Sequence, residues 1–364
     1  MLFKKIRYIF DEKGARNTGI IVMNKKVSLK DIASKVGVST ALVSYVLNNK
    51  KTDRIGKEIA GRIKIAAKEL NYRTNQIAKS LKTNKTFTIG LIVADISNPF
   101  FSALARIIEE EADKKNYTVI FGSAEEQAEK SFKLINTLLD RQVDGFIIAP
   151  AENAESNVNY LIQHDVPFVL IDRYFPLIET NWVTLDNYKA SLMAVEHLLA
   201  GGNKRPGMIT YNTTLNNLRE RKTGYENALR KNNIHFEKDW RKEILFDSNI
   251  KSSVEKAIDE LLALPVPIDS ILFASNILAF HGLKYIHSNG IKIPGDLSII
   301  TFDEMEASDL FYAPLTYLEQ PVLEMGQLAT KILLENIDMK KDPVQIKLDA
   351  TLVVRKSTLP ILFK

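Results

Sequence analysis

Polar residues follow three short apolar runs of the chain, at places where a ligand could reach them. Asp172 follows VLI, Asn276 follows FAS and Asp303 follows ITF. A fourth polar residue, Arg221, lies three residues before Gly224 in a segment expected to be helical. Carboxylates, an amide and an arginine fork can together hold vicinal hydroxyls or a small anion. For any one of these residues, a capping or loop-stabilising role remains the alternative.

The two aspartates, Asp172 and Asp303, could also be considered as a catalytic pair. The sequence contains no nucleophile elbow, phosphate loop, dinucleotide fingerprint or metal-binding cluster to accompany them. There is no cysteine, and the five histidines lack the spacing of metal ligands. We therefore predict that the protein is not an enzyme and that it holds neither a metal ion nor a cofactor.

The elements that would position these residues begin at Phe87. From there, apolar runs such as FTIGLIVADI, TVIFGS and VDGFIIAP alternate with amphipathic segments. This alternation is typical of βαβ units and predicts an α/β fold with parallel sheets flanked by helices. Ligands of such folds bind beyond the carboxyl ends of the strands. Asp172, Asn276 and Asp303 each follow an apolar run, so we expect them at this end of a strand.

Charge is divided unevenly along the chain, and its basic end is suited to a polyanion. Residues 1–85 contain 20 basic and 6 acidic residues, a net charge of +14. Residues 86–364 contain 29 basic and 38 acidic residues, a net charge of −9. Such asymmetry indicates binding to nucleic acid or to an anionic membrane surface. No apolar run approaches the roughly 18 to 20 residues that cross a bilayer.

Two short helices are predicted within the basic end. Ser28 and Asp31 form a capping-box pattern that begins the first helix, and Gly37 ends it. Ser39 can cap the second helix, which follows at once. A third amphipathic helix, residues 57–70, completes a small core and presents a basic face that could lie along phosphates. Helices arranged in this way are typical of helix-turn-helix proteins, although a pair alone could be a simple helical hairpin.

The chain resembles the LacI/GalR (lactose-repressor) family from Val27 to about Thr358. The resemblance rests on LKDIASKVGVSTALVSYVLN in the head, NYRTNQIAKSLK in a hinge, and IGLIVADISNPFF, RQVDGFIIAP, VPFVLIDR and GDLSIITFDE in the core. It implies a three-helix helix-turn-helix head, then a hinge helix, then a core like that of periplasmic binding proteins. That core would have two lobes, three crossovers between them, and an effector in the cleft.

The resemblance also implies which residues of the head and hinge touch DNA. Base contacts are expected from Thr40, Ala41 and Tyr45, and phosphate contacts from Ser39, Ser44 and Asn48. The predicted DNA-binding set further contains Ser28, Asn75 and Leu81. Because the family commonly has Arg where this chain has Tyr45, a bidentate guanine contact is not assumed, and a packing role for Tyr45 stays open.

The hinge is expected to insert Leu81 into the minor groove at the centre of the operator. Packing of Leu81 on Ile77 or on the core is the alternative. The family's Pro before Asn75 is replaced by Thr74, which would loosen the entry to the hinge helix. The short basic segment alone has too little apolar surface to hold a helix, so we expect a conditional helix.

In the core, the resemblance assigns effector contacts to polar and aromatic residues. Ile277 occupies a position where the family often has Asp, so the ligand chemistry need not follow that of other members. The predicted effector-binding residues are Asn98, Phe100, Phe101, Asp172, Arg221, Asn276 and Asp303.

Five segments are expected along the chain. They are a leader, residues 1–22, either disordered or a wrongly assigned start; a DNA-binding domain, 23–72; a hinge helix and linker, 73–85; an effector-binding and dimerisation core, 86–358; and a tail, 359–364. No heptad segment follows VVRKST, which favours a dimer over a tetramer built through a coiled coil. The first 22 residues lack the continuous apolar core of a signal peptide, so a cytoplasmic protein is expected.

These observations predict a transcription regulator, expected to be a repressor, that binds a near-palindromic DNA operator as a homodimer. A small-molecule effector, expected to be a sugar or sugar derivative, would control it. One rival is an extracytoplasmic sugar-binding protein of a transporter, which would need an export signal. Another is a receptor whose altered head no longer reads DNA.

Overall fold

A computed structural model describes residues 27–48, 54–72, 85–246, 249–305 and 310–358. The chain divides into two compact units, residues 1–79 and 80–364, which we describe separately. The predicted leader, hinge helix and tail, with Asn75 and Leu81, lie outside the described residues. Within the described part of the chain, no helix has the length and apolar character needed to cross a membrane.

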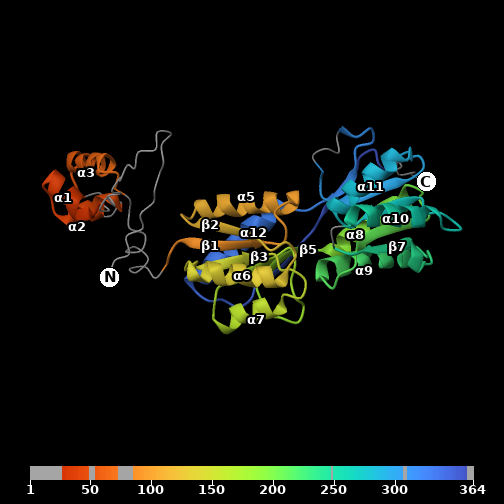
Figure 1. The fold of residues 1–364 in the computed structure, drawn as a ribbon, viewed down its shortest axis with the longest axis horizontal. Coiled ribbons are helices and arrows are strands. Elements are labelled where there is room, and N and C mark those ends of the chain that lie inside the picture. Colours follow the sequence, from red (N-terminus) through yellow and green to blue (C-terminus); the bar gives the residue numbers. More distant parts are fainter. Residues whose placement is uncertain (1–26, 49–53, 73–84, 247–248, 306–309, 359–364) are drawn as a thin grey trace, which may run out of the picture. The chain divides into compact units, whose positions relative to one another are not determined.

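The described residues of the first unit form three helices, α1 (Leu29–Val36), α2 (Thr40–Leu47) and α3 (Lys57–Glu69), labelled in Figure 1. One buried residue from each helix, Ile32, Val43 and Ile63, forms the centre of their shared core. Gly37 ends α1 with a φ of 76°, a left-handed conformation that glycine adopts without strain. Arg62 of α3 also donates to the Val36 carbonyl at 3.1 Å, which fastens α3 to the end of α1.

The second unit has two lobes, each built on a sheet. The first sheet is entirely parallel, in the order β11-β5-β4-β3-β1-β2. Its strands are β1 (Thr88–Val93), β2 (Thr118–Ser123), β3 (Gly145–Ile148), β4 (Phe168–Ile171), β5 (Trp182–Leu185) and β11 (Gln345–Leu348).

Helices cover both faces of this first sheet (Figure 1). Leu91 packs in the apolar cluster that includes α5 (Pro99–Asp113) and α12 (Val322–Asp338). The next residue, Ile92, packs in the cluster that includes α6 (Ala128–Asp140) and α7 (Glu155–Gln163). Because neighbouring residues of β1 are both buried, the strand appears in the sequence as a continuous apolar run.

The second sheet has the order β12-β10-β9-β8-β6-β7, and only the β10–β12 pair is antiparallel. Its strands are β6 (Pro206–Tyr211), β7 (Arg241–Ile244), β8 (Ser270–Phe273), β9 (Ser298–Phe302), β10 (Thr316–Glu319) and β12 (Thr351–Val353). Its helices are α8 (Asn187–Ala200), α9 (Asn216–Lys231), α10 (Ile250–Leu262) and α11 (Asn276–Ser288), with a 3₁₀ turn, η2 (Lys238–Trp240).

Close packing of α8 on α9 fixes the helix that carries Arg221. A Cβ on Gly224 would lie 2.2 Å from the carbonyl oxygen of Tyr188, so no other residue fits there without a backbone shift. The chain passes between the lobes after β5, after β10 and after β11. The predicted fold, a helix-turn-helix head followed by a two-lobed α/β core, is confirmed; the antiparallel β12 is the one departure from all-parallel sheets in the described residues.

Candidate functional site

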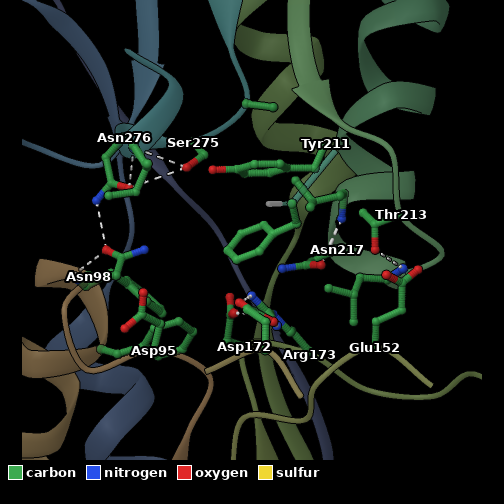
Figure 2. Close-up of a pocket in the computed structure, with 18 of the residues that line it drawn as sticks. Asp95, Asn98, Glu152, Asp172, Arg173, Tyr211, Thr213, Asn217, Ser275 and Asn276 are labelled. Carbon is green, nitrogen blue, oxygen red and sulfur yellow. Dashed lines mark hydrogen bonds and ion pairs between the residues drawn. The ribbon is translucent and has the colours of Figure 1, made fainter. Parts of the chain in front are cut away.

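A cleft of about 430 Å³ opens between the two lobes, within the size range of small-molecule sites (Figure 2). It lies beyond the carboxyl ends of strands from both sheets, as the strand-end rule predicts. The structure brings all seven predicted effector residues into its lining: Asn98, Phe100, Phe101, Asp172, Arg221, Asn276 and Asp303.

Two asparagines meet across the cleft. Asn98 caps α5 by accepting from the Phe100 amide at 3.1 Å, and Asn276 begins α11 in the other lobe. The Asn276 Nδ2 donates to the Asn98 Oδ1 at 3.0 Å (Figure 2). The same side chains therefore line the cleft and join its two walls.

Further polar contacts connect the lobes. The Glu152 Oε1 accepts from the Thr214 amide at 2.5 Å and from its hydroxyl at 2.8 Å. Burial tends to raise the Glu152 pKa, but these hydrogen bonds hold it below its ordinary value. Near the crossovers, the Lys347 ammonium donates to Glu220 at 2.7 Å. The relative position of the lobes thus depends on a few polar contacts that could break when the cleft opens.

Arg221 is held rigidly at the floor of the cleft. Its Nε donates to Asn187 Oδ1 at 2.7 Å, its Nη1 donates to the Ala274 carbonyl at 2.7 Å, and its guanidinium lies 3.6 Å from the centre of the Phe302 ring. Burial lowers the Arg221 pKa to about 10, an effect that Asp172 and Asp303 oppose. The guanidinium therefore stays charged at neutral pH, with a position fixed before any ligand arrives.

Asp172 and Asp303 directly follow strands β4 and β9 in left-handed backbone conformations, with φ of 66° and 64°. Such conformations are costly for residues other than glycine and concentrate at functional sites. Burial raises the pKa of both carboxyls, that of Asp303 to about 6. Gln320 donates to the Asp303 Oδ1 at 2.8 Å.

An ion pair that the sequence did not indicate lies next to Asp172. Arg173 binds Glu126 through both terminal nitrogens, at 2.6 and 2.7 Å, and its Nε lies 3.3 Å from Asp172. Burial opposes the charge of Arg173, yet Glu126 and Asp172 together hold its pKa above the ordinary value. Arg173 therefore serves to hold the carboxylates of the cleft wall.

In the head, the predicted base-contact residues lie on α2. Thr40 and Ala41 are exposed in its first turn and Tyr45 is partly exposed one turn later. Ser39, which caps α2, accepts from the Leu42 amide at 3.2 Å. Phosphate-contact candidates Ser44 and Asn48 lie along the same helix and its end, and Asn48 donates to the Ser44 carbonyl at 2.8 Å.

The structure gives Ser28 a definite local role. Its amide and its hydroxyl both donate to the Asp31 carboxylate, each at 2.7 Å. Ser28 therefore begins α1 as expected. Its hydroxyl proton is already used, so a phosphate contact would require this hydroxyl to turn away from Asp31.

Known families match both parts of the chain. Residues 28–75 match bacterial regulatory proteins of the lacI family, and residues 195–358 match the periplasmic binding protein-like domain. The "Probable HTH-type transcriptional regulator EndR" of Paenibacillus polymyxa is 31% identical over 86% of this chain and 92% of its own length. The chain belongs to the LacI family.

Solved structures agree with this assignment. The lac repressor dimer bound to operator and the anti-inducer ONPF has a TM-score of 0.80 at 23% identity and covers 92% of this chain and 100% of its own. The CelR–cellobiose complex has a TM-score of 0.69 at 22% identity and covers 91% of this chain and 99% of its own. At these sequence identities, the structural similarity shows that the fold is shared. Members of the LacI family are DNA-binding transcription regulators and not enzymes, as the sequence predicted.

This LacI-family chain also lines its cleft with residues that we did not predict. Most of them end or follow a strand of the core, a position that can be recognised in the sequence. Three have buried polar atoms with no hydrogen-bond partner in the described residues, namely Arg173 Nε, Tyr211 Oη and Gln320 Oε1. The Arg173 Nε lies 3.3 Å from Asp172, and the Tyr211 hydroxyl points toward Ser275 (Figure 2). The unpredicted lining residues with side-chain chemistry include Glu126, Glu152, Arg173, Tyr211, Asn217 and Gln320.

Proposed function

We propose that the protein is an effector-controlled repressor that acts in the cytoplasm and binds a near-palindromic operator as a homodimer. The observation that carries the proposal is the convergence of seven predicted effector residues in one cleft, in a chain whose basic end folds as a helix-turn-helix unit. A two-fold dimer presents two heads, which suits an operator of two half-sites.

The effector that suits this cleft best is a carbohydrate. Carboxylates accept from sugar hydroxyls, Arg221 and Asn217 can donate to them, and the exposed Phe246 at the cleft edge can pack on a sugar ring. The unpartnered Tyr211 and Gln320 atoms would gain partners from such a ligand. CelR, which has the same fold, is solved as a complex with cellobiose.

Control would work through the angle between the lobes. A ligand that touches Asp172 in one lobe and Arg221 in the other binds best at one cleft opening, and only such differential affinity can shift a conformational equilibrium. The Asn98–Asn276 and Glu152–Thr214 contacts would form or break with that opening. The shift would change whether the paired hinge helices can order on DNA, with Leu81 as the wedge that opens the central base step.

Selection from a random pool of DNA duplexes tests the proposal directly. We expect the full chain to enrich one near-palindromic site, and we expect its affinity to fall with salt at a slope of about −0.9 per phosphate contact. Deleting residues 1–22 should leave this affinity unchanged. Enrichment of no sequence over random DNA would contradict the proposal and favour a receptor whose head no longer reads DNA.

A further inference from the structure

The cleft is lined by many more acidic than basic side chains. Among the described residues, two arginines line it, Arg173 and Arg221, and neither lysine nor histidine does. The carboxylates come from both lobes and lie at the floor as well as the rim. They are Asp95, Glu125, Glu126, Glu152, Asp172 and Asp303.

Both arginines already interact with groups of the protein, and Arg173 is ion-paired. Both terminal nitrogens of Arg173 donate to Glu126, and its Nε faces Asp172. Two nitrogens of Arg221 donate to Asn187 and to the Ala274 carbonyl, and its guanidinium lies over the Phe302 ring. Arg173 therefore offers an incoming phosphate no free fork, and the remaining N–H groups of Arg221 lie beside Asp172 and Asp303, whose charges oppose the approach of an anion.

The negative charge is only partly compensated. Around the two arginines, the carboxylates of Glu126, Asp172 and Asp303 face two guanidinium groups, which leaves one carboxylate in excess. At the rim, Asp95 accepts from the amide and the hydroxyl of Ser97, neither of which carries charge. Like charges brought together away from water repel strongly, so a further anion would be disfavoured and a cation favoured.

We propose that the cleft selects its ligand by charge: it accepts a polyhydroxylated ligand that is uncharged or carries an amine, and rejects the phosphorylated or carboxylated form of the same sugar. Of the two ligand chemistries that the strand-end residues allow, vicinal hydroxyls and a small anion, this excludes the second. The proposal rests on the proposed function, because it concerns the ligand of the same cleft.

Charge-matched sets of sugars test this selection. The probes are glucose, galactose and ribose, each with its phosphate ester, together with glucosamine, galactosamine and glucuronate. Melting temperature of the full chain identifies the sugar that binds, and calorimetric titration gives its affinity. We expect each anionic form to bind at least about tenfold more weakly than the uncharged form of the same sugar, and the amine form to bind no more weakly.

The possible outcomes separate this inference from the proposed function. An anionic form that binds as well as the uncharged form would overturn the inference while leaving effector binding intact. An amine form that binds more weakly than the anionic form would also overturn it. If no sugar of any charge raised the melting temperature, the carbohydrate effector itself would be contradicted, and the inference with it.

A pair of variants assigns the selection to the carboxylates of the cleft. In Asp172→Asn and Asp303→Asn the shape is kept and one negative charge is removed, so the ratio of uncharged to anionic affinity should fall several-fold. The ratio is informative even where both affinities drop. Asp140→Asn, at the end of α6 and outside the cleft lining, removes the same charge and should leave the ratio unchanged. An unchanged ratio in both cleft variants would overturn the inference.

Discussion

The reading helix of the head, α2, carries the predicted base-contact residues. It differs from the effector cleft of the core in how far its side chains are exposed before a ligand binds. On α2, Thr40 and Ala41 are exposed, and the neighbouring Ser39 is satisfied by the helix backbone. In the cleft, Asp172 is 4% exposed and Arg221 is 5% exposed, and Asp172 follows its strand in a left-handed conformation. The head therefore presents exposed side chains, whereas the cleft holds buried charge that a ligand can compensate.

This difference predicts how substitutions act. A change in the reading helix should alter DNA affinity with little effect on folding, because Thr40 and Ala41 are exposed. A change in the cleft should alter both ligand affinity and stability, because each charge there is coupled to others.

The largest effect is expected for Arg221→Ala. Losing charge-assisted contacts in a desolvated site costs about 1.5–3 kcal/mol, roughly 10- to 150-fold in effector affinity. Operator affinity without effector should stay unchanged. Arg219→Ala, an exposed position on the same helix, is the matched control for calorimetric titration with the bound sugar. Loss of operator binding in Arg221→Ala would contradict the expectation that effector binding and DNA binding depend on different residues.

Asp303→Asn should stabilise the ligand-free protein. Because burial raises the carboxyl pKa from 3.8 to about 6, Asp303 disfavours the folded state once both states ionise. This penalty is absent below pH 4, grows between about pH 4 and 6, and is complete above pH 6. The variant should therefore gain about 1–3 kcal/mol in the free energy of unfolding at pH 7.5 and none near pH 4. Urea denaturation at both pH values measures this, and an equal effect at both would contradict the assigned cause.

A change in the reading helix should have a smaller effect and should leave folding intact. Tyr45→Ala is expected to lower operator affinity by about 1–2 kcal/mol, in the lower part of the range for base contacts. The salt slope should stay the same, because no phosphate contact is lost. Ser34→Ala, exposed on α1, is the control in a fluorescence anisotropy titration. A large loss of head stability in Tyr45→Ala would instead favour its packing role.

The smallest effect concerns the helix cap. Ser39→Ala removes the acceptor for the Leu42 amide and should cost the head about 1 kcal/mol of unfolding free energy. The thermal unfolding transition of the head should shift while that of the core does not. A shift of the core transition would show that the two units unfold together.

Local signals allowed the head to be predicted closely. Ser28, Gly37 and Ser39 are residue types that favour helix ends, and in the structure Ser28 and Gly37 cap α1 while Ser39 caps the start of α2. Central strands were also predictable, because β1 and β6 are buried along almost their whole length.

Two strands at the sheet edges, β7 and β11, escaped prediction for a physical reason. β7 has the sequence RKEI and β11 has QIKL, and both are partly exposed, so neither forms an apolar run. The cleft shows the same limit. Strand ends indicated Asp172 and Asp303, and the same rule would have found Glu126, whereas Asn217 lies on α9 and reaches the cleft only through long-range packing.

The central claim, that the cleft controls the head, is tested most directly by one titration. Operator binding by the full chain is measured by fluorescence anisotropy with and without the sugar that raises its melting temperature. We predict that this sugar changes the operator Kd at least about fivefold, the lower end of typical allosteric coupling, in wild type and Arg219→Ala but not in Arg221→Ala. A sugar that binds the cleft and leaves the operator Kd unchanged in wild type would contradict the account.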